Sequence, residues 1–260
     1  MKRLTPWQRA YRTLWLQEQW FLRQYAVDKE SLLDRRLQEL APDKALEALH
    51  AAFEKAFVTV FEKGEGLIGR TTRREERQAA FQVRQYALDL REDRKNLGAV
   101  AKAARAAGRG SAAISAAAGV GMGLLGMGLP DVPLFTALLL RSVYEIGESC
   151  GFSHESDPER RFILCLIEAA LSSGQALEER NQALDQWIQT GQWTDPLPMR
   201  GQMQAAARRL SETVLCGKLL QGVPLVGAVG GAEDMVCLNR VRRYAALKYR
   251  RRFLLERAAR

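Results

Sequence analysis

The charged residues best suited to chemistry lie inside or beside the most apolar part of the chain. Asp131 is the only charged residue between positions 111 and 140, and Arg141 and Glu145 follow on the next predicted helix. A buried carboxylate beside an arginine is most often a structural ion pair. At the mouth of an apolar cavity, the same groups can instead hold the polar end of a small molecule. We therefore predict Asp131, Arg141 and Glu145 as ligand-binding residues, with a structural ion pair as the alternative.

A catalytic role would need a second acid, or a nucleophile with a base in reach. The nearby serines, Ser111, Ser142 and Ser149, have no histidine partner evident in the sequence, and His154 lies in a polar segment. No catalytic residue is predicted. The sequence favours a protein without enzymatic activity, and an uncharacterised hydrolase stays open as a third hypothesis.

The sequence offers little to a metal ion or a cofactor. Its four cysteines are far apart and form no Cys-x-x-Cys pair, so we expect reduced cysteines in the core. Residues 121–126 match the letters of the Gly-x-Gly-x-x-Gly fingerprint, which binds a dinucleotide only between a strand and a helix. An alanine-rich segment precedes them here. We predict no cofactor and no metal site; the residues considered for zinc are Cys150, Cys165, Cys216, Cys237, His50 and His154.

The C-terminal segment is strongly basic. Residues 240–260 contain nine basic residues and one acidic residue, whereas the whole chain has a net charge of +9. Arg243, Arg250 and Arg257 recur every seven residues on one side of a predicted helix, which suits an anionic membrane surface. We predict these three as membrane-binding residues. Nucleic acid is not expected as a partner because no recognition fold accompanies the basic segment, and a solvated face on a core helix is the alternative.

Residues 111–146 are predicted to form an apolar helical hairpin that positions the first three candidates. Its first half consists mostly of Ala, Gly and Met, and small residues let helices approach closely. Pro130 and Pro133 flank Asp131 and disfavour a continuous helix there. A bilayer span needs roughly 20 apolar residues, but Ala and Gly gain little from lipid and Asp131 interrupts the run. A buried hairpin is therefore favoured over insertion into one leaflet or a full span.

The chain is predicted to be all-α, a single bundle of about nine helices with this hairpin at its centre. No segment alternates polar and apolar residues over more than a few positions, and helix-capping signals recur, as at Thr5 and Thr72. One helix is expected from Thr72 to about Ala107. We divide the chain into an N-terminal helical extension, residues 1–69, and a larger helical domain, residues 70–260. Three tryptophans among the first twenty residues either dock the first helix on the core or mark a membrane interface.

Several blocks of the sequence resemble the EcsC family. The glycine-rich run is followed by Leu-Pro-Asp-Val-Pro-Leu at 129–134, Arg-Ser-Val-Tyr-Glu-Ile-Gly at 141–147 and Asp-Pro-Glu-Arg at 157–160; a second glycine-rich block lies at 223–232. The order and spacing of these blocks, from Gln78 to the C-terminus, are similar to those of the family. The resemblance implies a bacterial protein, in some cases encoded beside ABC-type exporters, with no established reaction.

Composition and the N-terminus favour a cytoplasmic protein. Apolar residues make up 47% and charged residues 27% of the chain, and the N-terminus lacks the apolar core of a signal peptide. The preferred hypothesis is a protein that lies peripherally on the inner face of the plasma membrane and assists a membrane transport or secretion complex. It would attach through the basic C-terminal helix and the apolar hairpin, with an anionic surface or a transporter subunit as partner. The alternative is a binding protein for a lipid or other apolar small molecule, held in a cavity between the helices.

Overall fold

The structure, a computed structural model, describes residues 4–27, 43–67, 73–108, 132–194, 196–220 and 231–259. Several predictions fall on other residues. The Gly- and Ala-rich half of the predicted hairpin, the corner with Asp131, and the glycine motif at 121–126 all lie outside the described residues. The part of the hairpin that is described, residues 132–146, is helical.

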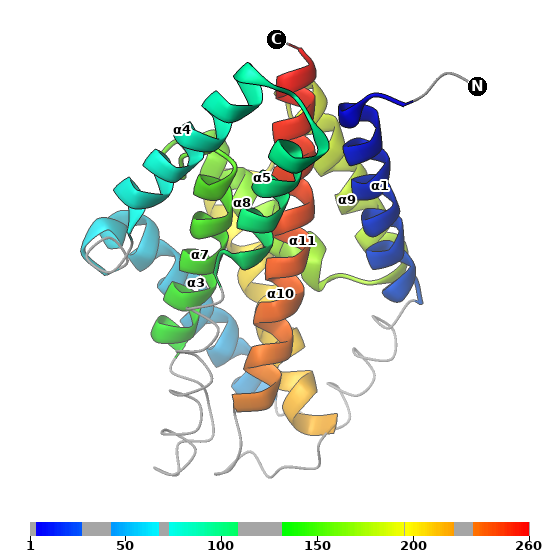
Figure 1. Ribbon diagram of the computed structural model, residues 1–260. Helices are drawn as coiled ribbons and strands as arrows, with labels where there is room; N and C mark the ends of the chain where they lie inside the picture. The colour runs from blue at the N-terminus through cyan, green and yellow to red at the C-terminus, as the bar shows by residue number, and fades with distance from the viewer. Residues whose placement is uncertain are drawn as a thin grey trace.

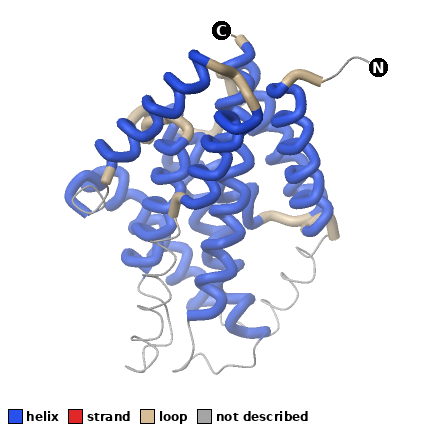
Figure 2. The backbone as a smooth tube through the Cα atoms, viewed as in Figure 1, coloured by secondary structure: helices blue, strands red, loops and turns tan. Residues whose placement is uncertain are grey.

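Across the described ranges every regular element is a helix, which confirms the all-α prediction (Figures 1 and 2). Short loops join successive helices where the chain between them is described (Figure 2). These helices are α1 (Pro6–Gln24), α3 (Asp43–Leu67), α4 (Arg74–Leu90), α5 (Arg94–Ala106), α7 (Val132–Ser149), α8 (Asp157–Leu171), α9 (Gly174–Thr190), α10 (Met199–Leu220) and α11 (Gly231–Ala258).

Local sequence signals set several helix ends. Thr5 caps α1, because its Oγ1 accepts the N–H of Gln8 at 3.1 Å and its own N–H donates to the Gln8 Oε1 at 2.9 Å. Gly191 ends α9 in the left-handed conformation, with φ of 71°, which glycine adopts without strain. Both ends agree with the sequence pattern.

The single helix predicted from Thr72 to about Ala107 is wrong, because the chain bends at residues 91–93, between α4 and α5. Asp93 caps α5 by accepting the N–H of Asn96 at 2.9 Å. The Asn96 side chain donates to the backbone oxygens of Ala87 and Arg91 at 3.1 and 2.8 Å, which holds the bend closed. Local polar contacts of this kind compete with a continuous helix.

α11 runs through the middle of the bundle (Figure 1) and contacts α1, α5, α7, α8, α9 and α10. All residues from 244 to 250 are buried, so no side of this stretch faces solvent. The adjacent α7 is nearly as enclosed, and its Leu139, Leu140 and Val143 are fully buried. Each such side chain stabilises the fold by about 1.5–3 kcal/mol relative to an exposed position.

The two described helices of the N-terminal extension pack against the rest of the chain. α1 lies against α11 and α5, and α3 packs against α10 and α7. The division near residue 69 stays a prediction. Of the described helices, none combines the length and the apolar character needed to cross a bilayer.

Candidate functional site

Arg141 and Glu145, two of the predicted ligand-binding residues, form an ion pair along one face of α7. The Glu145 Oε1 accepts from the Arg141 Nε at 3.0 Å, and the Glu145 Oε2 accepts the backbone N–H of Gly108 at 3.0 Å. The carboxylate therefore ties the chain just beyond α5 to α7. Gly108 has a φ of 71°, and a Cβ there would lie 3.0 Å from the Ser142 Cβ, so the close approach requires glycine. Asp131, the third predicted residue, lies outside the described part of the chain.

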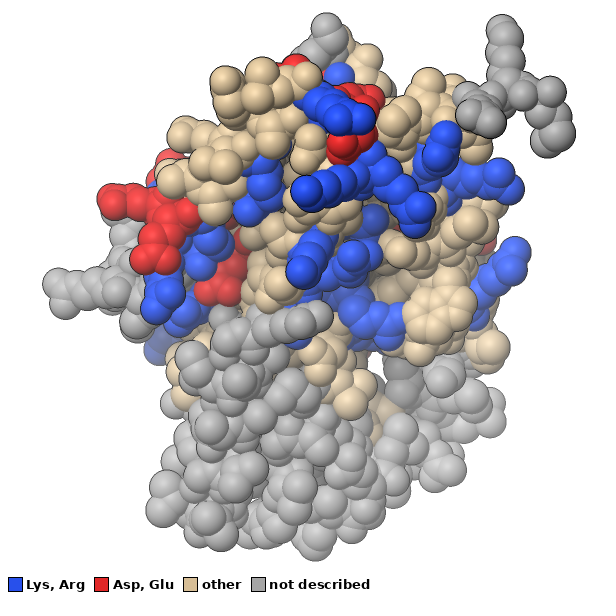
Figure 3. Space-filling view, viewed as in Figure 1, with Lys and Arg blue, Asp and Glu red and all other residues tan. Residues whose placement is uncertain are grey.

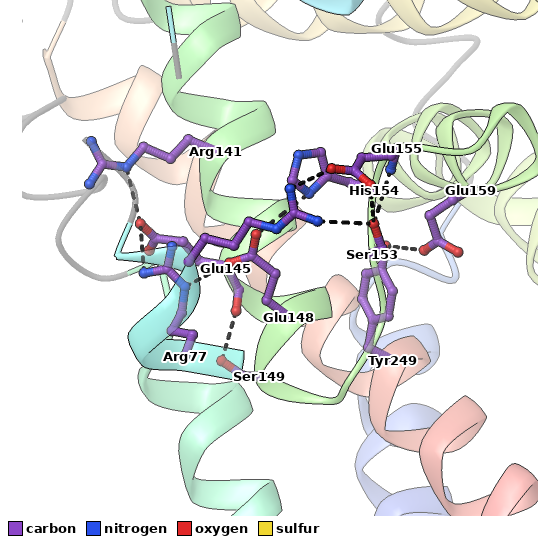
Figure 4. A network of polar contacts seen from close by, with 11 residues as sticks. Arg77, Arg141, Glu145, Glu148, Ser149, Ser153, His154, Glu155, Glu159 and Tyr249 are labelled. Carbon is purple, nitrogen blue, oxygen red and sulfur yellow. Dashed lines mark hydrogen bonds and ion pairs between the residues drawn. The ribbon is translucent and has the colours of Figure 1, made fainter. Parts of the chain in front are cut away.

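The same network extends one turn along α7 and across to α4 (Figure 4). The Arg77 Nε donates to the Glu148 Oε2 at 2.7 Å, and its Nη1 lies 3.7 Å from the Glu145 Oε1. Arg77 thus bridges two buried carboxylates from a neighbouring helix. These contacts hold α4 against α7, and the ligand-binding role of Arg141 and Glu145 stays a prediction.

His154 lies beside this network without a charge at neutral pH. Its ring stacks on Tyr144 with the centroids 3.9 Å apart, and its Nδ1 lies 3.5 Å from the Glu148 Oε1. Burial first, and then the nearby cations with Arg74 foremost, lower the pKa of His154 to about 4, although Glu155 acts in the opposite direction. At pH 7 the imidazole is therefore neutral, and its contact with Glu148 is not an ion pair.

The hydroxyls near this network are occupied by other partners. Ser142 donates to the backbone oxygen of Leu139 at 2.7 Å, and Ser149 donates to that of Glu145 at 2.7 Å. Both bonds remain within α7, and such back-bonding is common for serine in helices. The geometry around these two hydroxyls supplies no activated nucleophile.

A second charge cluster joins α1, α9 and α11. The Lys248 Nζ, which is fully buried, lies 2.6 Å from the Asp185 Oδ1 and 3.6 Å from the Glu18 Oε1. The Arg251 Nη1 lies 2.6 Å from the Glu18 Oε2. Two cations here meet two carboxylates, so the cluster is internally neutralised and holds three helices together.

The three predicted membrane-binding arginines do not share one exposed face. Arg243 is exposed, and its guanidinium lies 4.8 Å from the centroid of the Trp20 ring. Arg250 is 6% exposed and donates to the Gln17 Oε1 at 2.8 Å. Arg257 forms ion pairs with Asp89 and Glu92, each at 2.8 Å. The reason is that α1 packs beside Arg243 and Arg250, whereas Arg257 meets the end of α4 and the bend that follows it.

Instead, the described helices α1, α5 and α11 enclose an arginine-lined groove, which we call the arginine groove. Its wide compartment, of about 610 Å³, lies between α1, α5 and the C-terminal part of α11. Its aromatic compartment, of about 370 Å³, contains Trp20 and Phe21. Figure 3 shows Lys and Arg side chains gathered over this face. The arginines of the two compartments are Arg9, Arg12, Arg94, Arg105, Arg242, Arg243 and Arg250.

No Asp or Glu is among the described residues that line either compartment. Arg105 and Arg250 line both compartments and so lie where the two meet. Burial first, and then the neighbouring Arg105, lower the pKa of Arg250 to about 10, although Cys150 and Glu18 act in the opposite direction. Arg250 is still protonated at pH 7. The charged guanidinium of Arg250 is therefore partly desolvated. It forms no ion pair with a described carboxylate, whereas the buried Lys248 pairs with Asp185.

Five groove arginines were not predicted as site residues from the sequence, although two spacings pointed to four of them. Arg94 and Arg105 are eleven residues apart, which is three turns of an α-helix and places them on one face of α5. Arg9 and Arg12 are three residues apart and share a face of α1. The sequence did not reveal that these two faces meet.

The described residues thus form an all-α bundle with a groove lined by arginines. The chain belongs to the EcsC protein family, whose model matches residues 2–254. The match extends further towards the N-terminus than the blocks beginning at Gln78, and it takes in α1 and α3. A search of curated proteins and a search of solved structures found no match.

Proposed function

We propose that this protein attaches peripherally to an anionic membrane surface through the arginine groove and the exposed side of α1. The main support for the proposal is the arginine groove. Seven arginines line this concave face, and none of the described residues that line it is acidic. Each Lys or Arg near an anionic surface contributes about 1 kcal/mol. Residues from three helices therefore act together, in place of the single C-terminal stripe expected from the sequence.

Apolar side chains beside the groove supply a second attraction. Trp20 is 59% exposed and Leu16 is 53% exposed, and both line the groove from α1. Trp15 is also exposed on this helix. Tryptophan is enriched at membrane–water interfaces, because its ring is apolar and its N–H remains hydrated. This arrangement supports shallow contact with lipid headgroups.

The proposed location is the inner face of the plasma membrane, where anionic lipids give the leaflet a negative surface potential. The proposed role is to assist a membrane transport or secretion complex without enzymatic chemistry. Its support is the resemblance to the EcsC family, some members of which are encoded beside ABC-type exporters. The family resemblance thus supports the proposed role, and the arginine groove supports the proposed attachment to the membrane.

Vesicle co-sedimentation tests the attachment. The full chain is mixed with phosphatidylcholine vesicles, or with vesicles that also contain phosphatidylglycerol, at low and at high salt. We expect recovery with the anionic vesicles only, falling as salt rises, because screening at physiological ionic strength acts within about 8 Å. Equal recovery with neutral and anionic vesicles at low salt would refute an electrostatic attachment.

A further inference from the structure

The junction of the two compartments holds a buried guanidinium, that of Arg250, which forms no ion pair with a described carboxylate, although Glu18 is close enough to raise its pKa. Arg250 donates a hydrogen bond to the uncharged amide oxygen of Gln17. Arg105, across the junction, adds a second positive charge. Keeping a guanidinium in such a position is costly unless an anion compensates it. Since no described ion pair of the protein includes either arginine, the junction is suited to an anion from outside the chain.

The wide compartment next to this junction is apolar at its floor. Leu97, Val100, Phe253 and Leu254 are buried core residues that form it. Gly98 also lines the compartment, and a Cβ built there meets nothing within 4 Å, so the space above it is open. The volume of about 610 Å³ lies within the roughly 300–1,000 Å³ of small-molecule sites.

The apolar floor and the charged junction lie in line along α5. From Arg94 to Arg105 the helix rises about 16 Å, at about 1.5 Å per residue. A ligand that lies along this floor with one end at Arg105 and Arg250 therefore needs a long apolar portion and a terminal acid group.

We propose that the arginine groove binds one molecule of a single-chain anionic amphiphile, such as a long-chain carboxylate. Its acid group lies between Arg105 and Arg250, and its chain lies over the floor of the wide compartment. The inference rests on the proposed function, because both use the same face of the protein. It adds the class of lipid that this face selects.

Isothermal titration calorimetry of the full chain with monomeric dodecanoate tests the inference. Dodecanol has the same chain without the charge, and acetate has the charge without the chain. We expect dodecanoate to bind at one site per chain. We expect dodecanol to bind at least about tenfold more weakly, because hydrogen bonds to charged groups contribute more than neutral ones. Acetate is expected not to bind measurably.

Three variants locate the site. Gly98→Leu places a side chain in the open space and should abolish dodecanoate binding, whereas Gly98→Ala fills little of it and should retain binding. Both changes raise the helix propensity of α5, so both variants are expected to stay folded, which circular dichroism checks. Arg105→Gln removes an exposed charge at the junction and should weaken dodecanoate binding about tenfold.

The inference is overturned if dodecanoate does not bind, if dodecanol binds equally well, or if Gly98→Leu binds dodecanoate unchanged. Failure here is distinguishable from failure of the proposed function. Recruitment to anionic vesicles without binding of monomeric dodecanoate would leave the attachment standing and remove the ligand site. Binding of dodecanoate without recruitment to vesicles would leave the ligand site standing and remove the membrane attachment.

Discussion

Replacing Glu145 tests whether the buried network on α7 is structural. In Glu145→Ala the backbone N–H of Gly108 loses its acceptor, and Arg141 loses a partner at 3.0 Å. Each hydrogen bond to a charged group contributes about 1.5–3 kcal/mol, and less where water can replace the lost partner. The Arg141 side chain is 18% exposed and regains some hydration, whereas Gly108 is buried. We therefore expect a loss of roughly 3–5 kcal/mol in the free energy of unfolding.

Urea unfolding followed by circular dichroism measures this loss as a fall in the midpoint with an unchanged slope. Glu145→Gln keeps one acceptor oxygen and should lose only about 1–2 kcal/mol. The double variant with Arg141→Met should show a coupling of about 1 kcal/mol or more. A Glu145→Ala variant within about 0.5 kcal/mol of the unaltered chain would refute the structural role, since that is the range of ordinary surface substitutions.

Two further predictions concern buried charge. Lys248→Met leaves the carboxylates of Asp185 and Glu18 with too little positive charge and should cost about 3–5 kcal/mol in thermal or urea unfolding; a loss below about 1 kcal/mol would contradict it. His154 has a folded pKa of about 4 against an ordinary value of 6.5, so the unfolded chain takes up the proton first. Stability is therefore fully present above pH 6.5 and falls as the pH drops towards 4, by at most about 3 kcal/mol. His154→Phe, which keeps an aromatic ring on Tyr144, should flatten this dependence, and an unchanged slope would contradict the assignment.

The features that could be predicted from the sequence are local. The cap at Thr5 and the end at Gly191 depend on residues within one turn. The Arg141–Glu145 pair was predictable in the same way, because residues four apart share a helix face. The bend at residues 91–93 was missed, because no Gly or Pro stands there; the signals present were Asp93 and Asn96, whose types favour helix caps and turns.

What the sequence could not supply is which helix faces meet. Arg257 pairs with Asp89 and Glu92, which lie 168 and 165 residues away. Arg250 follows the same seven-residue spacing as Arg243, yet it is buried because α1 and α5 cover it. The groove itself exists only where α1, α5 and α11 come together, so its arginines could be seen individually in the sequence but not as one site.

The most direct test of the arginine groove as the membrane-binding face compares two variants of equal net charge. One carries Arg9→Ser, Arg12→Ser and Arg94→Ser in the groove, and the other carries Lys55→Ser, Arg200→Ser and Arg208→Ser on α3 and α10. At about 1 kcal/mol per arginine, the groove variant should bind phosphatidylglycerol vesicles roughly 100-fold more weakly. The matched variant should bind nearly as well as the unaltered chain. Equal weakening of both variants would mean that net charge alone governs binding, and it would contradict a defined membrane-binding face.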